Sequence, residues 1–310
     1  MAAAAILERL PAWATTGVGS LPHDDPAAAA AHAVAAYELP FLPQLPRVEG
    51  DMVAEWLGAD PARCGWSPAR DRERPPAWEA LLERLAQAPP AHGVVKLQVT
   101  GPVTLARALD APELAGDLAR WLAANVAGQV RALRERGLDA LLVVDEPALA
   151  SAAGVEERVW DPLRGAAPAW GLHLCCAVPW ELVRAARPDL LSLDLLLPGA
   201  LTGAALPALR ELLARGGRVA WGVVPAAPGA APPGSPPAAA PPPRAVLDAA
   251  RAGLHALGVD LGQLARRSLL TPSCGTGLAT VAHEREAAAS LRATAARLRA
   301  ERDLGPAVRP

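Results

Sequence analysis

Several residue types are scarce in this chain, and each scarcity excludes a class of protein. Its 310 residues include four cysteines, one tyrosine, one phenylalanine and, among 30 basic residues, a single lysine, Lys96. Four cysteines are too few for a disulfide-stabilised scaffold, so their thiols are available for metal binding or chemistry. The basic residues are scattered and the formal net charge is −2, which is unlike the charge pattern of a nucleic-acid binder. We therefore expect no nucleic-acid partner.

Long apolar runs and a basic leader are also missing. Glu8 and Arg9 interrupt the apolar start MAAAAILERL, where a signal peptide would need an unbroken apolar stretch. The longest weakly charged apolar run covers residues 195–209 and contains two prolines and two glycines. It is too short and too broken to span a bilayer, which takes about 20 residues. The sequence thus predicts a cytoplasmic protein without membrane contact.

Short β-rich runs alternate with longer helical patterns, which is typical of a parallel α/β fold. Apolar residues make up 52% of the chain, enough for a large core. In residues 118–136, leucines and valines recur every three or four positions and predict an amphipathic helix, and residues 283–302 predict another. The predicted strands are Thr15 to Gly19, Pro40 to Leu45, Val94 to Thr100, Ala140 to Val144, Gly171 to Cys176, Leu190 to Asp194, Arg218 to Val223 and Ser268 to Thr271. Eight such units in a chain of this length predict a (β/α)8 TIM barrel, which usually needs about 250 residues.

One proline-rich stretch bears on the number of domains. Residues 226–243 hold eight prolines and no charge, so they suit neither a strand nor a helix. They could link two domains, but the residues that follow contain only one predicted strand and two helices. We therefore predict a single domain over residues 1–310, with this stretch as a loop after the seventh strand.

The polar residues that could carry chemistry fall at the carboxyl ends of the predicted strands, where barrel enzymes place their sites. These are Ser20, Asp145, Glu146, His173, Cys175, Asp194 and Cys274. His173 and Cys175 lie two apart in an extended segment, so their side chains share one face and Cys176 points the other way. Imidazole nitrogen and thiolate sulfur are preferred zinc ligands. The pair therefore favours half of a zinc site.

Two further residues can complete that site. Cys274 follows the eighth predicted strand in the segment TPSCGTG, and Asp194 ends the sixth. The loops after all strands of a barrel converge over its mouth, so residues far apart in the sequence can meet there. The alternative is that each cysteine is a small buried hydrophobic residue, which is the common role of an isolated cysteine.

Five segments, in order, resemble the catalytic barrel of cobalamin-independent methionine synthase. They are TTGVGSLPHDD (15–25), QVTGPVTLA (98–106), VVDEPALA (143–150), HLCC (173–176) and TPSCG (271–275). The chain is similar to that barrel alone, without the additional N-terminal barrel of the family. The resemblance covers nearly the whole chain, and it implies an S-methyltransferase that converts homocysteine to methionine.

The resemblance also implies roles for individual residues. It makes His173, Cys175 and Cys274 ligands of a Zn²⁺ ion, and it places Asp194 where the family has a glutamate ligand. It implies that Gly19 and Ser20 bind the carboxylate of the amino acid. It also gives Asp145 a substrate-binding and catalytic role at the ammonium group. From the residues alone, Ser20 could instead cap a helix and Asp145 could accept backbone hydrogen bonds in a turn.

The chain departs from the family in two places. The family has a histidine after its seventh strand that protonates a departing folate nitrogen, whereas residues 221–230 here contain none. The position of a glutamate that assists the family's aspartate corresponds to Pro46, with Glu49 the nearest acid. Both methyl-tetrahydrofolate and a methyl-corrinoid, either free or on a protein, therefore stay open as donors. Two other readings are a metal-free enzyme similar to uroporphyrinogen decarboxylase and a noncatalytic zinc- or thiol-binding relative.

The remaining unusual residues suggest structural roles. The isolated Lys96 is expected to form an ion pair near the end of the third strand, and Cys64 and Cys176 are expected to pack in the structure. The other histidines have no identifiable partners in the sequence, which favours surface or helix-packing roles: His23, His32, His92, His255 and His283.

Overall fold

The computed structural model describes residues 2–58, 66–67, 74–151, 154–201, 203–227 and 242–303. A single curled sheet of seven parallel strands occupies the centre, in the order β1-β7-β6-β5-β4-β3-β2. The strands are β1 (Ala14–Thr15), β2 (Val94–Thr100), β3 (Asp139–Asp145), β4 (Ala169–Leu174), β5 (Leu190–Asp194), β6 (Arg218–Val224) and β7 (Ser268–Pro272). All carboxyl ends therefore open toward the same end of the sheet.

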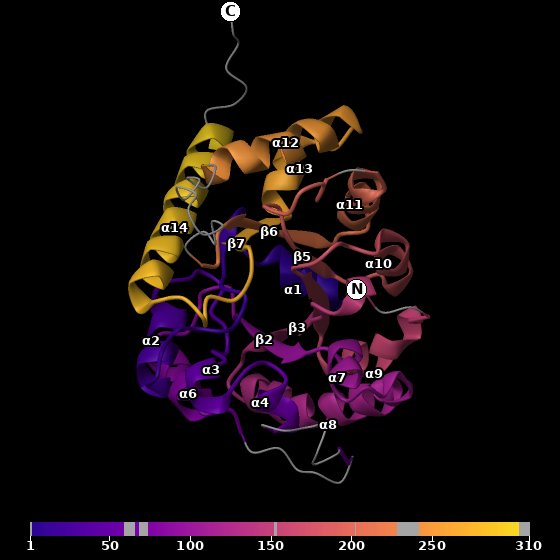
Figure 1. The fold of residues 1–310 in the computed structure, drawn as a ribbon. Helices are drawn as coiled ribbons and strands as arrows, with labels where there is room; N and C mark the ends of the chain where they lie inside the picture. The colour runs from indigo at the N-terminus through magenta and orange to yellow at the C-terminus, as the bar shows by residue number, and fades with distance from the viewer. Residues whose placement is uncertain are drawn as a thin grey trace, which may run out of the picture.

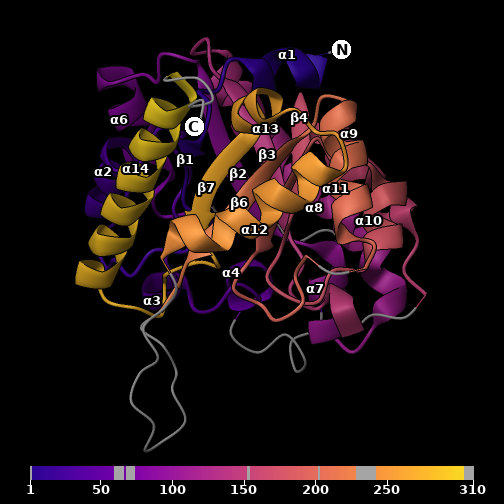
Figure 2. The same ribbon diagram turned by 90° about the horizontal axis from the view of Figure 1, so that it is seen from above.

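Helices surround this sheet on its outer side (Figure 1). The α-helices of the described residues are α1 (Ala2–Glu8), α2 (Pro26–Ala35), α3 (Pro46–Glu49), α4 (Ala54–Leu57), α6 (Trp78–Gln87), α7 (Pro102–Ala108), α8 (Ala115–Arg134), α9 (Asp161–Ala166), α10 (Trp180–Ala186), α11 (Ala205–Ala214), α12 (Pro243–Ala256), α13 (Leu261–Arg266) and α14 (Val281–Asp303). Seen from the side, α1 crosses one end of the sheet, whereas α3 and α4 lie near the opposite end, toward which the strand arrows point (Figure 2). That second end carries the polar residues described below.

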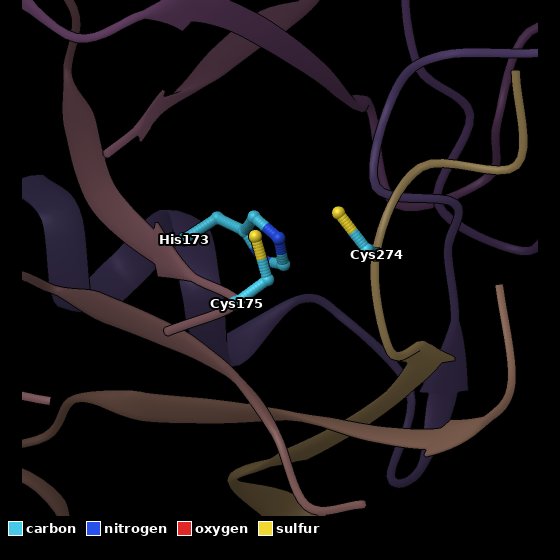
Figure 3. A group of neighbouring side chains, drawn as sticks. All are labelled: His173, Cys175 and Cys274. Atoms are coloured by element: carbon cyan, nitrogen blue, oxygen red, sulfur yellow. The ribbon is translucent and has the colours of Figure 1, made fainter. Parts of the chain in front are cut away.

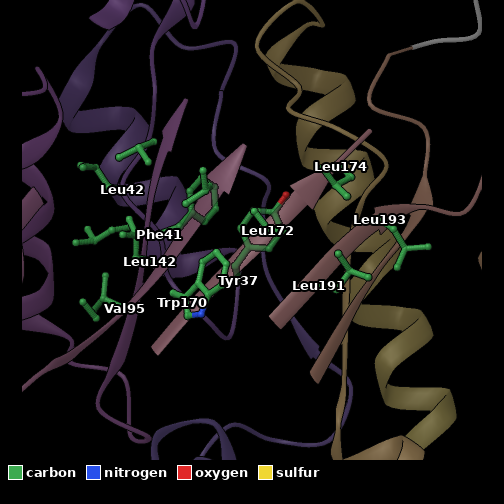
Figure 4. Packing of buried hydrophobic residues seen from close by; sticks show 14 of the residues in the cluster. Tyr37, Phe41, Leu42, Val95, Leu142, Trp170, Leu172, Leu174, Leu191 and Leu193 are labelled. Atoms are coloured by element: carbon green, nitrogen blue, oxygen red, sulfur yellow. The ribbon is translucent and has the colours of Figure 1, made fainter. Parts of the chain in front are cut away.

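The alternation of side chains along each strand separates two apolar layers. Outward-facing residues such as Val95, Leu142, Trp170, Leu172 and Leu191 pack in the main core between the sheet and the outer helices (Figure 4). The inward-facing residues nearer the amino ends form a second cluster, which α1 covers: Ile6, Leu7, Leu10, Ala14, Leu39, Val94, Leu141, Val143, Ala169, Leu190, Ala220 and Leu269. The interior is thus closed by apolar side chains at the α1 end.

The sequence predicted eight strands, and the structure corrects two of them. The strand predicted from Thr15 to Gly19 is only the two-residue β1 (Ala14–Thr15). The segment predicted over residues 40–45 is not a strand but makes two isolated bridges, Phe41 with Lys96 and Ser20 with Gln44. Pro40 and Pro43 interrupt it, because proline has no N–H to donate to a ladder. What the structure shows is therefore a TIM-barrel-like curled sheet of seven strands, rather than a closed barrel of eight.

Most other elements lie close to where the sequence places them. The helix predicted over 118–136 is α8 (Ala115–Arg134), and the one predicted over 283–302 is α14 (Val281–Asp303). The proline-rich stretch 226–243 falls largely outside the described residues, which end at 227 and resume at 242. Within the described part of the chain, no helix combines the length and the apolar character that crossing a bilayer requires.

Candidate metal centre

Three of the predicted zinc ligands lie together at the carboxyl end of the sheet. His173 is the second-to-last residue of β4, Cys175 directly follows that strand, and Cys274 follows β7. One ligand atom from each lies within 4.8 Å of the other two. Figure 3 shows Cys274 facing the other two side chains from the opposite side of the opening. The structure thus joins strand ends that are about 100 residues apart in the sequence.

Backbone contacts hold the Cys274 loop in place. Ser273 donates its N–H to the Val224 carbonyl of β6 at 2.8 Å, and Thr276 donates to the Ser20 carbonyl at 3.0 Å. The side chain of Thr276 also donates to the buried Glu284 carboxylate at 2.6 Å. Contacts on both sides of Cys274 therefore fix the direction of its thiol.

The charges around these thiols favour a metal ion. The thiol of Cys175 hydrogen-bonds to Cys274 and, together with His173, lowers the Cys274 pKa to about 4. The same contact raises the pKa of Cys175 far above its ordinary value. The surroundings of Cys274 therefore favour its thiolate, which is the form of cysteine that metals bind.

The histidine offers one nitrogen to this group. Nδ1 of His173 lies 2.9 Å from the hydroxyl of Ser192 on β5. Nε2 is buried and has no hydrogen-bond partner among the described residues. A buried nitrogen without a partner, next to two sulfurs, fits zinc in both chemistry and number of donors. These three residues could hold the ion and leave a fourth position open for a substrate.

Asp194, the fourth predicted ligand, does not belong to that group of three. It ends β5, and its Oδ1 accepts a hydrogen bond from the N–H of Leu196 at 2.8 Å. Burial raises the pKa of Asp194, and a nearby negative charge on Cys274 adds to that rise. The carboxylate of Asp194 therefore interacts electrostatically with Cys274, but its hydrogen bond is to the backbone of a local turn. A ligand role for Asp194 stays a prediction.

Asp145 ends β3 beside His173 in the sheet register. Its side chain is buried, Oδ2 accepts from Gln98 at 3.3 Å, and Oδ1 has no hydrogen-bond partner in the described part of the chain. Burial raises its pKa to about 7, against the opposing effects of His173 and Lys96. An unpaired carboxylate oxygen of this kind can accept a hydrogen bond from a bound cationic group.

Lys96 and two glutamines form a polar network that the sequence did not reveal. Lys96 is buried, and its ammonium donates to the Val18 carbonyl and to Oε1 of Gln98. Nε2 of Gln98 donates to Gln44 at 2.8 Å as well as to Asp145. The amide of Gln98 thus lies between the lysine and Asp145, and among the described residues Lys96 does not form the ion pair that the sequence predicted. The alternation of Lys96, Gln98 and Thr100 along one strand was the signal for an inward polar face.

Gly19 lies next to Gln98, and Ser20 lies next to the loop that carries Cys274. A Cβ on Gly19 would lie 1.1 Å from Nε2 of Gln98, so glycine is needed there for the glutamine to pack. The Ser20 hydroxyl accepts from the N–H of Gly277 at 3.2 Å. Ser20 therefore contacts the Cys274 loop rather than capping the helix at residue 26, whose cap is Asp25. Substrate binding by Gly19 and Ser20 stays a prediction.

Glu146, the other acid at this strand end, has a structural role. Its fully buried carboxylate accepts from the N–H groups of Val103 and Thr104, from the Thr104 hydroxyl and from Nε1 of Trp160. It thereby satisfies the first N–H groups of α7, which have no partner within the helix. Within the Asp-Glu-Pro segment, Asp145 thus faces the site, whereas Glu146 is buried at the start of α7.

Cys176 and several of the other histidines contact neighbouring groups in the structure. The Cys176 thiol points to the Glu146 carbonyl at 3.8 Å, as the alternation predicted. His32 stacks near His23 with ring centres 5.3 Å apart and contacts Glu284, and His92 contacts the Glu38 carbonyl. Cys64 lies outside the described residues.

No protein-family model and no curated protein sequence matches the chain. Among solved structures, the chain is similar to a methyltransferase from Methanosarcina mazei, with a TM-score of 0.55 and 16% sequence identity. That similarity covers 94% of this chain and 97% of the other. At this identity the likeness shows a shared fold.

Proposed function

We propose that the chain is a zinc-dependent methyltransferase that transfers a methyl group to a thiol. The observation that carries the proposal is the group formed by His173, Cys175 and Cys274, whose ligand atoms lie within 4.8 Å of one another at the carboxyl end of the sheet. A structural neighbour that is itself a methyltransferase supports the reaction class. We propose homocysteine as the thiol, with methionine as the product.

A bound zinc ion would supply one element of the chemistry, because it would keep a thiol with an ordinary pKa of about 8.5 as a nucleophilic thiolate at neutral pH. The residues of the chain would do the rest. His173, Cys175 and Cys274 would hold the ion, and Asp194 would be a weak fourth ligand. The unpaired Oδ1 of Asp145 receives the substrate ammonium, and Ser20 with Gly19 lines the carboxylate end.

The methyl transfer forms a sulfur–carbon bond and breaks the bond between the methyl group and its donor, which keeps the electron pair. A folate nitrogen must be protonated to leave, so such a donor needs an acid nearby. A methyl-corrinoid leaves as reduced cobalt without a proton. Because residues 221–230 contain no histidine, we propose that either methyl-tetrahydrofolate or a methyl-corrinoid is the donor, and an assay distinguishes them.

Metal analysis of the purified chain tests the site first. We expect about one zinc per chain in the wild type and in Cys176→Ser, and loss of the metal in Cys274→Ser and Cys175→Ser. Cys176→Ser is a matched control, because Cys176 neighbours a ligand but its thiol points to the Glu146 carbonyl. A wild-type protein without zinc would contradict the proposal and favour the decarboxylase-like reading.

A methylation assay then tests the reaction. The wild type is given homocysteine with methyl-tetrahydrofolate or methylcobalamin in parallel, and methionine is measured. Asp145→Asn should weaken homocysteine binding by about 10- to 100-fold, because a hydrogen bond to a charged group contributes about 1.5–3 kcal/mol. A zinc-loaded wild type that binds homocysteine but turns over neither donor would identify a binding protein instead of an enzyme.

A further inference from the structure

The histidine of the metal centre has a buried neighbour that the proposed function leaves without a role. Ser192 lies on β5 in direct register with His173 on β4, and both are buried. The Ser192 hydroxyl is 2.9 Å from Nδ1 of His173. Among the described residues, this ring nitrogen is the only hydrogen-bond partner of that hydroxyl that the structure gives. Their pairing is therefore a specific one between adjacent strands.

The geometry decides which ring nitrogen can meet a metal. Nδ1 is engaged by Ser192, whereas Nε2 is buried without a partner among the described residues. A neutral imidazole carries its proton on one nitrogen and a lone pair on the other, and the hydrogen bond at one fixes the state of the other. If Nδ1–H donates to Ser192, the lone pair is on Nε2.

The hydroxyl of Ser192 must then direct its own hydrogen elsewhere. Ser192 lines a small interior cavity together with Thr16, Lys96, His173 and Thr271. The space open to the centre of a water molecule is about 10 Å³, which is the room that one buried water requires. Across this cavity, Oγ1 of Thr271 is buried and has no hydrogen-bond partner in the described part of the chain. Most of the cavity lining is apolar, so the hydroxyls of Ser192 and Thr271 are the polar groups that a water there would bridge.

We propose that Ser192 is a positioning residue for the metal centre. Its hydroxyl accepts the Nδ1–H of His173, which fixes the ring with Nε2 toward the two cysteines, and it donates its own hydrogen into the cavity shared with Thr271. This inference rests on the proposed zinc site, and it identifies Ser192 as the residue that orients His173 within that site. Without Ser192 the ring loses both its orientation and its favoured tautomer.

Zinc affinity, measured by competition with a chromophoric chelator, tests the role of Ser192. Ser192→Ala should weaken zinc binding about 10- to 100-fold, the usual effect of removing such a supporting group. Thr271→Val removes the hydroxyl across the cavity at nearly constant volume and should have a smaller effect in the same direction. Ser268→Ala is the control, because this buried hydroxyl on β7 of the same sheet accepts from Nε1 of Trp221 and donates to the Leu264 carbonyl of α13. It should reduce the melting temperature without changing zinc affinity.

A second measurement separates positioning from general stability. In a cadmium-113-loaded, nitrogen-15-labelled chain, we expect coupling between the metal and Nε2 of His173 and a slowly exchanging proton on Nδ1. In Ser192→Ala that proton should exchange faster, while Ser268→Ala keeps the wild-type rate. Coupling to Nδ1, or an unchanged affinity and exchange rate in Ser192→Ala, would overturn the role of Ser192 and leave the zinc proposal standing. A wild-type chain that binds neither metal would overturn both.

Discussion

Lys96 is the only lysine in the chain, and its ionisable side chain is buried. Its ammonium is held by the Val18 carbonyl and by Gln98, and it lies over the ring of Phe41 at 5.2 Å. Burial lowers its pKa to about 7, although the negative charge of Asp145 acts in the opposite direction. The lysine thus loses most of its preference for the charged form on folding.

This shift predicts how stability depends on pH. Between pH 7 and about 10, the unfolded chain binds a proton at Lys96 that the folded chain does not, so the free energy of unfolding should rise with pH. Lys96→Met removes this contribution. We therefore expect the wild type to gain at least about 1 kcal/mol relative to Lys96→Met over that range, since one pKa unit corresponds to about 1.4 kcal/mol.

Urea unfolding of both proteins at several pH values measures the difference, in which the titrating groups other than Lys96 and its neighbour Asp145 cancel. The free energy of unfolding of the wild type, minus that of Lys96→Met, should rise steadily between pH 7 and about 10. A difference that stays flat or falls would mean that Lys96 keeps its proton in the folded protein, for example by a direct pairing with Asp145.

The start of α7 shows how two distant motifs depend on each other. Gly101 precedes the helix, and its missing side chain makes room for Glu146, since a Cβ there would lie 2.0 Å from Cδ of the glutamate. Glu146 in turn accepts the first N–H groups of α7. The Gly-Pro-Val-Thr and Asp-Glu-Pro segments therefore fit together as one joint, which also sets the direction of Asp145.

Gly101→Ala should disturb that joint. The new Cβ displaces the Glu146 carboxylate from its buried donors, which we expect to cost about 2 to 4 kcal/mol of unfolding free energy. Gly128→Ala is the matched control, because Gly128 lies within α8 and a Cβ there meets nothing within 4 Å. That variant should gain about 0.5 to 1 kcal/mol from lower chain entropy and better helix propensity.

Chemical denaturation gives both values. Equal stabilities for the two glycine variants would show that Glu146 can move aside at little cost, and that the joint between the two segments is loose. A destabilised Gly101→Ala that still binds zinc normally would separate the joint from the metal centre.

At the scale of the whole molecule, the candidate metal centre lies outside the two apolar clusters that hold the fold together. The outer core and the inner cluster beneath α1 are both formed without His173, Cys175 or Cys274. These three side chains lie at the open end of the sheet (Figure 3). In a small zinc domain, by contrast, metal binding itself supplies the folding energy.

Removal of the metal should therefore leave the chain folded. A chelator is expected to lower the melting temperature by several degrees and to keep the far-ultraviolet circular dichroism unchanged. Zinc at 100 times its Kd adds about 2.7 kcal/mol of stability by mass action. Cys274→Ser should show no zinc-dependent change, whereas Cys176→Ser should behave as the wild type. Loss of secondary structure on chelation would refute this independence.

The order of elements and the residues at strand ends could be predicted from the sequence, because both follow from local patterns. The alternation of side chains in an extended segment placed His173 and Cys175 on one face and Cys176 on the other. Six of the predicted strands appear over nearly the same residues, from β2 to β7. The prediction of a strand over residues 40–45 was wrong, because a local apolar pattern does not show which backbone N–H groups must bond to a neighbouring strand.

Contacts between segments far apart in the sequence were decided only by the tertiary structure. The sequence by itself determined a parallel α/β chain with candidate metal ligands at its strand ends. Only the folded chain brought Cys274 to His173, put Ser192 behind the histidine, used Asp194 in a turn and buried Lys96 beside Gln98. The physical reason is that hydrogen bonding and burial depend on which side chains meet across the sheet, whereas residue periodicity records only the side of each element that faces the core.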